Sequence, residues 1–357
     1  MKLPCITMLT ALLLTAPAAA QLQIAPPATI PSTTPEKQKP KPPAPAKKEA
    51  APKPLASPKP APSAKPTPAP TVIPAPPTDN SNADLVYGAY QRGQYKTAFE
   101  LATARAQAGD PKAMTMLGEL YSNAMGIRRD YAKAAEWYKR AADAGDREAM
   151  FALAMLRISG RGGAVDKGEA VKLMASAAKL GEPRAAYNLA LLYLDGQTLP
   201  QDVKRSAELL RQAADAGLPE AQYALATFYK EGTGVPKDPE RAVRLLQAAS
   251  LADNVDAEVE YAIAMFNGTG TPKNQPAAVA LLRKASRQGS AIAQNRLAWV
   301  LINGVGTTMD KVEGFKWHLV AKTAGKGDPE LDKQLSDLPA EERAKAEAAA
   351  KKWLGNK

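Results

Sequence analysis

The chain contains very few residues that could act as nucleophiles or hold a metal ion. It has one cysteine, Cys5, and one histidine, His318, among 357 residues. A single cysteine excludes a disulfide framework and a thiolate metal site, and no motif of paired carboxylates accompanies the histidine. The sequence therefore predicts no enzyme, no metal and no cofactor, although hydrolysis by two carboxylates from distant segments stays open. The low aromatic content, 6%, favours helices that pack closely through alanine and other small residues.

Long apolar runs are scarce as well. The run from Ile6 to Ala16 has about 11 residues, whereas a membrane-spanning helix needs ~20. Lys2 precedes this run, and Ala18-Ala19-Ala20 provides an A-x-A cleavage site before Gln21. This pattern predicts a cleaved signal peptide at 1–20 and a periplasmic or secreted protein, with an uncleaved anchor as the alternative.

Proline and positive charge are concentrated in one segment. Pro26 to Pro77 holds 19 of the 31 prolines, eight lysines and two acidic residues. Such a segment cannot bury enough apolar area to offset its ordering entropy, so 21–78 is predicted to be a disordered Pro/Lys-rich linker. A solvated tail explains its charge of +6, and electrostatic contact with an anionic cell wall or membrane surface is the alternative. Nucleic acid is not an expected partner, because the tail lacks interleaved aromatic residues and export removes the chain from nucleic acid.

Beyond this segment the chain repeats itself every 36 residues, which shows in three columns. The alanine column is Ala113, Ala149, Ala185, Ala221, Ala257 and Ala293. The glycine column is Gly109, Gly145, Gly181, Gly217, then Asp253, Gly289 and Gly325. The aspartate column is Asp130, Asp166, Asp202, Asp238, Asn274 and Asp310. Three columns in register predict a stack of helical hairpins, because no single unit can bury its apolar face alone.

The columns also predict where the helices of each unit begin and end. Asp238 is suited to cap a second helix, with Pro239 at its first position. The glycine column predicts the left-handed residue that closes this helix, and next to Asp253 we expect Asn254 to take that role. Each unit should hold a first helix of about 12 residues, a loop, and a second helix of about 14 residues.

The loop between the two helices contains a Gly-x-Gly pair that resembles a phosphate cradle. Gly232 and Gly234 precede Lys237, but no Ser or Thr follows this lysine as a P-loop requires. Equivalent pairs recur in other units, at Gly160 and Gly162, Gly268 and Gly270, and Gly304 and Gly306. A phosphate loop is expected once, whereas a turn can recur, so these glycines are predicted to be turn residues.

The units from Ala113 to Asp146 and from Ala221 to Asp253 resemble Sel1-like repeats, which are relatives of the tetratricopeptide repeat. The resemblance covers six repeats at 111–328, preceded by a shorter opening hairpin at 83–110 that is closer to a plain tetratricopeptide hairpin. It implies an all-α fold, a right-handed α-solenoid over 79–328, and a bacterial protein that acts as an adaptor in signalling or cell-envelope complexes.

The resemblance also implies a partner site on the first helices of the repeats, which line the concave face in tetratricopeptide solenoids. Aligned on Leu189 and Ala190, it assigns this groove seven residues: Phe151, Met155, Tyr187, Leu191, Tyr223, Ile263 and Trp299. The alternative is that some of them fill the core between helices. His318 falls in the same column as Leu210 and Leu246, an apolar packing position, and is therefore predicted to pack rather than catalyse.

After the repeats, 329–357 is predicted to form C-terminal capping helices whose outer face is polar. The favoured function is an exported, non-enzymatic scaffold, adaptor or regulator that binds a protein or peptide partner in the cell envelope. The alternative is a peptidoglycan-binding or cell-wall-acting envelope protein.

Overall fold

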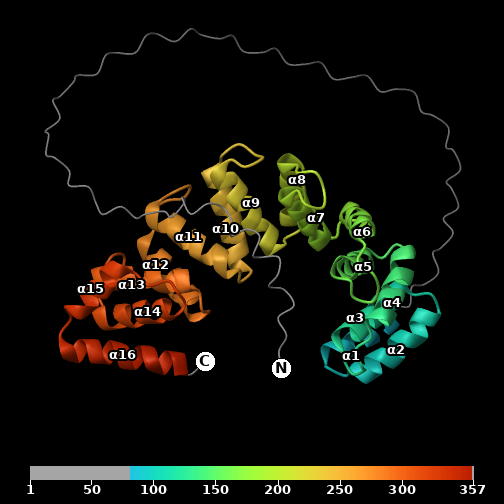
Figure 1. Cartoon of the computed structure of the whole chain (residues 1–357), viewed down its shortest axis with the longest axis horizontal. Helices are drawn as coiled ribbons and strands as arrows, with labels where there is room; N and C mark the ends of the chain where they lie inside the picture. Colours follow the sequence, from blue (N-terminus) through green and yellow to red (C-terminus); the bar gives the residue numbers. More distant parts are fainter. Residues whose placement is uncertain (1–80, 356–357) are drawn as a thin grey trace, which may run out of the picture. The chain divides into compact units, whose positions relative to one another are not determined.

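The computed structural model describes residues 81–355, so the predicted signal peptide and the predicted Pro/Lys-rich linker lie outside the described part. Within 81–355 the structure consists of sixteen helices and no strand, which confirms the all-α solenoid of 36-residue repeats (Figure 1). The helices are α1 (Ser81–Gln91), α2 (Tyr95–Gln107), α3 (Pro111–Asn123), α4 (Tyr131–Asp143), α5 (Arg147–Ser159), α6 (Lys167–Lys179), α7 (Pro183–Asp195), α8 (Val203–Asp215), α9 (Pro219–Glu231), α10 (Pro239–Leu251), α11 (Val255–Asn267), α12 (Gln275–Arg287), α13 (Ala291–Asn303), α14 (Lys311–Thr323), α15 (Pro329–Ser336) and α16 (Ala340–Gly355).

Helices α3 to α14 form six hairpins, one for each repeat. Each of these helices has 13 residues, close to the predicted lengths. Each helix packs on the helices before and after it in the chain, and every alanine of the 36-residue column is buried. Small side chains at these contacts let the helix backbones approach closely, so the core runs between consecutive helices.

The aspartate column caps the second helix of every repeat, as predicted. Each of its six side chains accepts a hydrogen bond from the backbone N–H three residues later, for example Asp238 from Arg241 at 2.9 Å. An N-cap of this kind stabilises a helix by ~1 kcal/mol.

The glycine column adopts the left-handed conformation that the sequence predicts, with φ between 73° and 99° at its glycines. The prediction for the exception was wrong. Asp253 itself has a φ of 59°, while Asn254 has a φ of −74° and caps α11 with its side chain. Asn254 serves the next helix, so the left-handed position falls to the residue that precedes it.

The Gly-x-Gly pairs are turn residues, as predicted. Gly232 ends α9 with a φ of 80°, and Gly234 has a φ of 66°. A Cβ atom on Gly234 would lie 2.7 Å from the carbonyl oxygen of Val203, at the start of α8 in the preceding repeat. The second glycine of the loop therefore lets consecutive repeats come into backbone contact.

Helices α15 and α16 follow the last repeat. Helix α16 packs on α14, where the Trp353 and Trp317 rings meet edge to face with centroids 5.0 Å apart. Its exposed face carries a Glu341–Lys345 pair at 2.6 Å. Among residues 81–355, no helix combines the length and apolar character needed to cross a bilayer.

Candidate functional site

The seven residues predicted to line the groove lie at the fifth and ninth positions of the first helices. All seven are half-buried, so none is lost to the interior and none is fully exposed. Six of them, all except Leu191, pack part of their side chains on the core. One core cluster is contacted by Phe151, Met155, Tyr187 and Tyr223, and the next cluster along the chain is contacted by Ile263 and Trp299. We call these seven residues the groove row.

Charged side chains of the following repeat lie near three aromatic members of the groove row, Phe151, Tyr187 and Tyr223. The Arg184 guanidinium lies 5.1 Å from the centre of the Phe151 ring. Burial, and to a lesser extent the Glu220 carboxylate, raises the pKa of Tyr187. Burial and the nearby Glu260 carboxylate likewise raise the pKa of Tyr223. These three half-buried rings therefore each have a charged side chain of the next repeat near them.

A cavity of about 390 Å³ lies at the N-terminal end of the same row. Its walls come from α1, α2, α3 and α5 and include Val86, Tyr87, Thr115, Met116 and Glu119. Thr115 and Glu119 occupy the fifth and ninth positions of α3, so the cavity continues the groove row into the first repeat. The apolar pattern of the sequence does not indicate this cavity, because Thr115 and Glu119 are polar. Their positions in the 36-residue repeat are the feature of the sequence that places them in line with the groove row.

Two polar side chains of this cavity, Glu119 and Arg105, make short contacts with neighbouring groups. The Tyr90 hydroxyl donates to the Glu119 carboxylate at 2.6 Å, and burial together with this hydrogen bond raises the pKa of Tyr90. Arg105 pairs with Asp110 at 2.6 Å. These bonds hold two polar side chains of the wall in place, while Val86 is buried and Met116 is half-buried beside the cavity.

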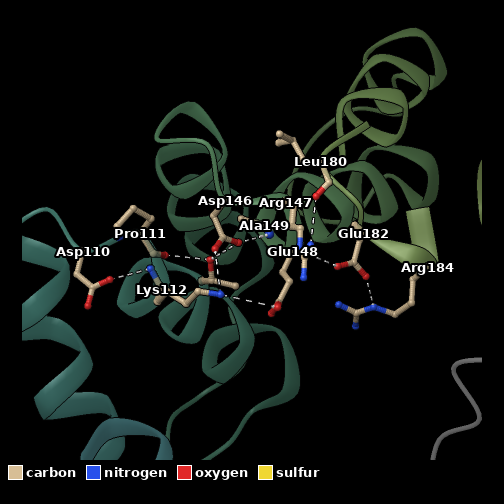
Figure 2. Close-up of polar contacts among 11 residues, drawn as sticks. Asp110, Pro111, Lys112, Asp146, Arg147, Glu148, Ala149, Leu180, Glu182 and Arg184 are labelled. Carbon is tan, nitrogen blue, oxygen red and sulfur yellow. Dashed lines mark hydrogen bonds and ion pairs between the residues drawn. The ribbon is translucent and has the colours of Figure 1, made fainter. Parts of the chain in front are cut away.

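A chain of polar contacts joins the N-terminal ends of α3, α5 and α7 (Figure 2). The Asp146 carboxylate caps α5 at Ala149 and accepts a hydrogen bond from Thr115 of α3. Lys112 reaches the same carboxylate at 3.8 Å, and Arg147 donates to the Leu180 carbonyl at 3.2 Å. Lys112 is exposed whereas Asp146 is buried, and together these contacts link the N-terminal ends of successive first helices.

Glu182 occupies the position that Asp146 occupies one repeat earlier, before the first helix of the next hairpin. Its carboxylate is almost completely buried and lies 2.7 Å from Arg184 and 4.0 Å from Arg147. Arg184 is the residue that also covers Phe151, so this carboxylate helps to position a guanidinium on the groove row.

His318 lies away from the groove row, on α14. Its side chain is fully buried, and its Nε2 atom lies 2.8 Å from the Asp332 carboxylate. The histidine packs as the repeat register predicts, but the sequence pattern did not indicate its aspartate partner, which comes from α15. No group of three or more His, Cys, Asp or Glu side chains within 81–355 is arranged to hold a metal ion.

Six consecutive stretches of the chain match the Sel1 repeat: 111–146, 147–182, 183–218, 219–254, 255–290 and 291–326. The chain belongs to the Sel1 repeat family. Solenoids of Sel1 repeats generally act as scaffolds for interactions between proteins. The comparison with curated proteins found no match.

The Sel1 fold is shared with solved structures. A Sel1 repeat protein from Oxalobacter formigenes is 24% identical, with a TM-score of 0.58 over 67% of this chain and 96% of that protein. The protein c5321, a protective antigen of uropathogenic Escherichia coli, is 23% identical, with a TM-score of 0.49 over 78% of this chain and 68% of its own. At 24% identity, the likeness to the Oxalobacter formigenes protein is one of fold alone.

Proposed function

We propose that this Sel1 repeat protein is exported to the bacterial cell envelope and binds an extended segment of a partner protein along the groove row. The observation that carries the proposal is the recurrence of half-buried apolar and aromatic residues at two fixed positions of successive first helices. Aromatic side chains with one face packed and one face open are frequent anchors of protein interfaces. The cavity between α1, α3 and α5 gives such a segment a place to insert one larger side chain.

Binding without turnover is the role that we propose. The groove row carries no serine, cysteine or carboxylate, and Glu119, one of the acidic residues that line its cavity, is bonded to Tyr90. Its charged neighbours, such as Arg184 and Glu220, are placed to select the charge pattern of a bound peptide rather than to transfer a proton.

Partner capture with matched variants tests this proposal. The full-length protein would be expressed in its own host, cross-linked in the intact envelope and purified, and its partners identified by mass spectrometry. A double substitution, Tyr187→Ala with Tyr223→Ala, is expected to lose the specific partner. Leu251→Ala is the matched control, because Leu251 is 80% exposed on α10 and lies outside the groove row. Equal recovery of the same partners by all three proteins would contradict the groove assignment.

The same variants address the cell-wall alternative. Sedimentation with purified peptidoglycan fragments, with and without the double substitution, measures whether the groove row holds cell-wall polymer instead of protein. Retention of the protein on peptidoglycan that depends on Tyr187 and Tyr223 would favour that alternative.

Export is tested separately. Fractionation followed by N-terminal sequencing is expected to find a periplasmic or secreted protein that begins at Gln21. A cytoplasmic protein that begins at Met1 would refute export while leaving the partner-binding test unaffected.

A further inference from the structure

A second cavity, of about 340 Å³, lies where α8, α9 and α10 meet. It contains no member of the groove row. Its walls are Arg211 and Asp215 of α8, Leu225 and Tyr229 of α9, and Arg241, Arg244 and Leu245 of α10. Three guanidinium groups and one carboxylate thus share a single hollow.

The tyrosine of this cavity is held as a hydrogen-bond donor. Its side chain is 5% exposed, and its hydroxyl oxygen accepts from Arg211 at 3.2 Å and from Arg241 at 3.4 Å. Because a phenolic oxygen has two lone pairs, both acceptor positions are taken and the hydroxyl proton remains to be donated. Burial by itself raises the pKa of Tyr229, but the hydrogen bonds and charges of Arg241 and Arg211 outweigh burial and lower it. The hollow therefore has a positive potential and an unused donor.

The positive charge in the cavity is only partly neutralised. Arg241 pairs with Asp238 at 3.1 Å. Within 81–355, neither Arg211 nor Arg244 has a carboxylate within ion-pair distance, and Asp215 pairs with none of the three arginines. Arg211 and Arg244 therefore have no ion-pair partner in the described part of the chain, and Asp215 is the one carboxylate among the residues that line the cavity.

The other repeats show that this arrangement is not required by the fold. Arg241 and Arg244 are the third and sixth residues of their second helix, a spacing at which side chains are neighbours. The corresponding pairs are Lys133 and Glu136, Glu169 and Lys172, Arg205 and Glu208, Ala277 and Ala280, and Glu313 and Lys316. Four repeats have opposite charges and one has two alanines, so the fourth repeat alone places two like charges there. Like charges at this spacing destabilise a helix, whereas an anion bound between them would reverse the effect.

We propose that the cavity between α8, α9 and α10 binds a phosphate monoester, with Arg211 and Arg244 neutralising the phosphate group and the Tyr229 hydroxyl donating to one of its oxygens. A phosphate monoester carries a charge of about −1.5 to −2 at neutral pH, so it can pair with both guanidinium groups that lack an ion-pair partner within 81–355, and three arginines outnumber the one carboxylate, Asp215, that lines the cavity. Guanidinium groups also present paired N–H donors that suit phosphate oxygens. The volume is at the lower end of the ~300–1,000 Å³ typical of small-molecule sites, which leaves space beside Leu245 for the organic part of the ligand.

Calorimetric titration of the full-length protein at constant ionic strength tests the proposal, with inorganic phosphate, phenyl phosphate and benzoate as probes. Saturable binding of both phosphates is expected, with phenyl phosphate tighter than benzoate by at least tenfold. A parallel titration with O-phosphoserine and glycerol 3-phosphate compares two sources of the group, a phosphorylated protein and a lipid or sugar phosphate. Tighter binding of either supports the site and indicates its source.

Substitutions place the binding in this cavity. Arg244→Gln and Arg211→Gln are each expected to weaken phenyl phosphate binding about tenfold, as for loss of one charge-assisted hydrogen bond. Arg205→Gln is the matched control, since Arg205 holds the position of Arg241 one repeat earlier and pairs with Glu208 at 2.8 Å. Its affinity is expected to stay within twofold of that of the unmodified protein.

Arg244→Glu separates a ligand site from a structural cluster. This substitution restores at Arg241 the pairing that Arg205 makes with Glu208, so it is expected to abolish phosphate binding without lowering the melting temperature. Absence of saturable phosphate binding, equal affinity for benzoate, or a clear drop in the melting temperature of Arg244→Glu would each overturn the proposal.

Discussion

The contact between consecutive repeats at the Gly-x-Gly loop can be measured by comparing Gly234→Ala with Gly217→Ala. Both glycines have a positive φ, 66° at Gly234 and 86° at Gly217, so an added Cβ atom strains the backbone at both. Only Gly234 is crowded. Its Cβ atom would lie 2.7 Å from the Val203 carbonyl oxygen, whereas nothing lies within 4 Å of a Cβ atom at Gly217.

The expected losses of stability follow from these two differences. A left-handed alanine costs ~1–2 kcal/mol, and the stiffer unfolded chain returns ~0.4–1 kcal/mol, so Gly217→Ala should lower the free energy of unfolding by ~0–1.6 kcal/mol. At Gly234 the collision adds a cost of the size found for overpacked interiors, ~1–3 kcal/mol, and the total becomes ~1–4.6 kcal/mol.

Urea unfolding of the full-length proteins, followed by circular dichroism, measures the difference between Gly234→Ala and Gly217→Ala. Hydrogen exchange shows which helices are destabilised by each substitution. We expect faster exchange in α8 and α9 for Gly234→Ala only, because the stability of a repeat protein is a sum of local and nearest-neighbour contributions. Equal losses for the two variants would refute the close approach at Val203.

Three further predictions concern particular side chains. Trp299→Ala is expected to weaken partner binding by ~2 kcal/mol. Because the ring is half-buried, the substitution should cost less stability than the ~3–5 kcal/mol lost with a core tryptophan. A large fall in melting temperature with unchanged binding would mean that Trp299 is a core residue. Tyr229 is expected to ionise below the ~10 of free tyrosine, and ultraviolet titration of Arg241→Gln should show this ionisation at higher pH, since the variant removes one of the hydrogen bonds that lower the pKa. The hydrogen bond from Lys322 lowers the pKa of Asp332. The charged carboxylate therefore stabilises the fold above about pH 4, and this stability is lost as the pH falls through the lowered pKa. Melting curves should show Asp332→Asn less stable than the unmodified protein at pH 7 and equal to it in strong acid, and a difference independent of pH would contradict this.

The periodicity of the sequence was enough to predict the repeats and most helix ends. Asp238 at a cap, Pro239 after it and Gly217 at a helix end each act through the backbone within a few residues, so their effect can be read locally. Local rules failed at Asp253, where two helix ends compete for adjacent residues and Asn254 is needed as the cap of α11.

The tertiary structure alone decided the features that join separate helices. Stacking brings Arg211, Tyr229 and Arg244 from three helices into one cavity, and it places Asp332 of α15 against the buried His318 of α14. It also sets the exposure of the groove row, since the fraction of Trp299 left open depends on how closely the neighbouring helix packs. The sequence by itself determined the helical hairpin and its 36-residue period, because these follow from local backbone chemistry. The cavities and contacts between hairpins depend on distances between helices, which only the packing of the solenoid sets.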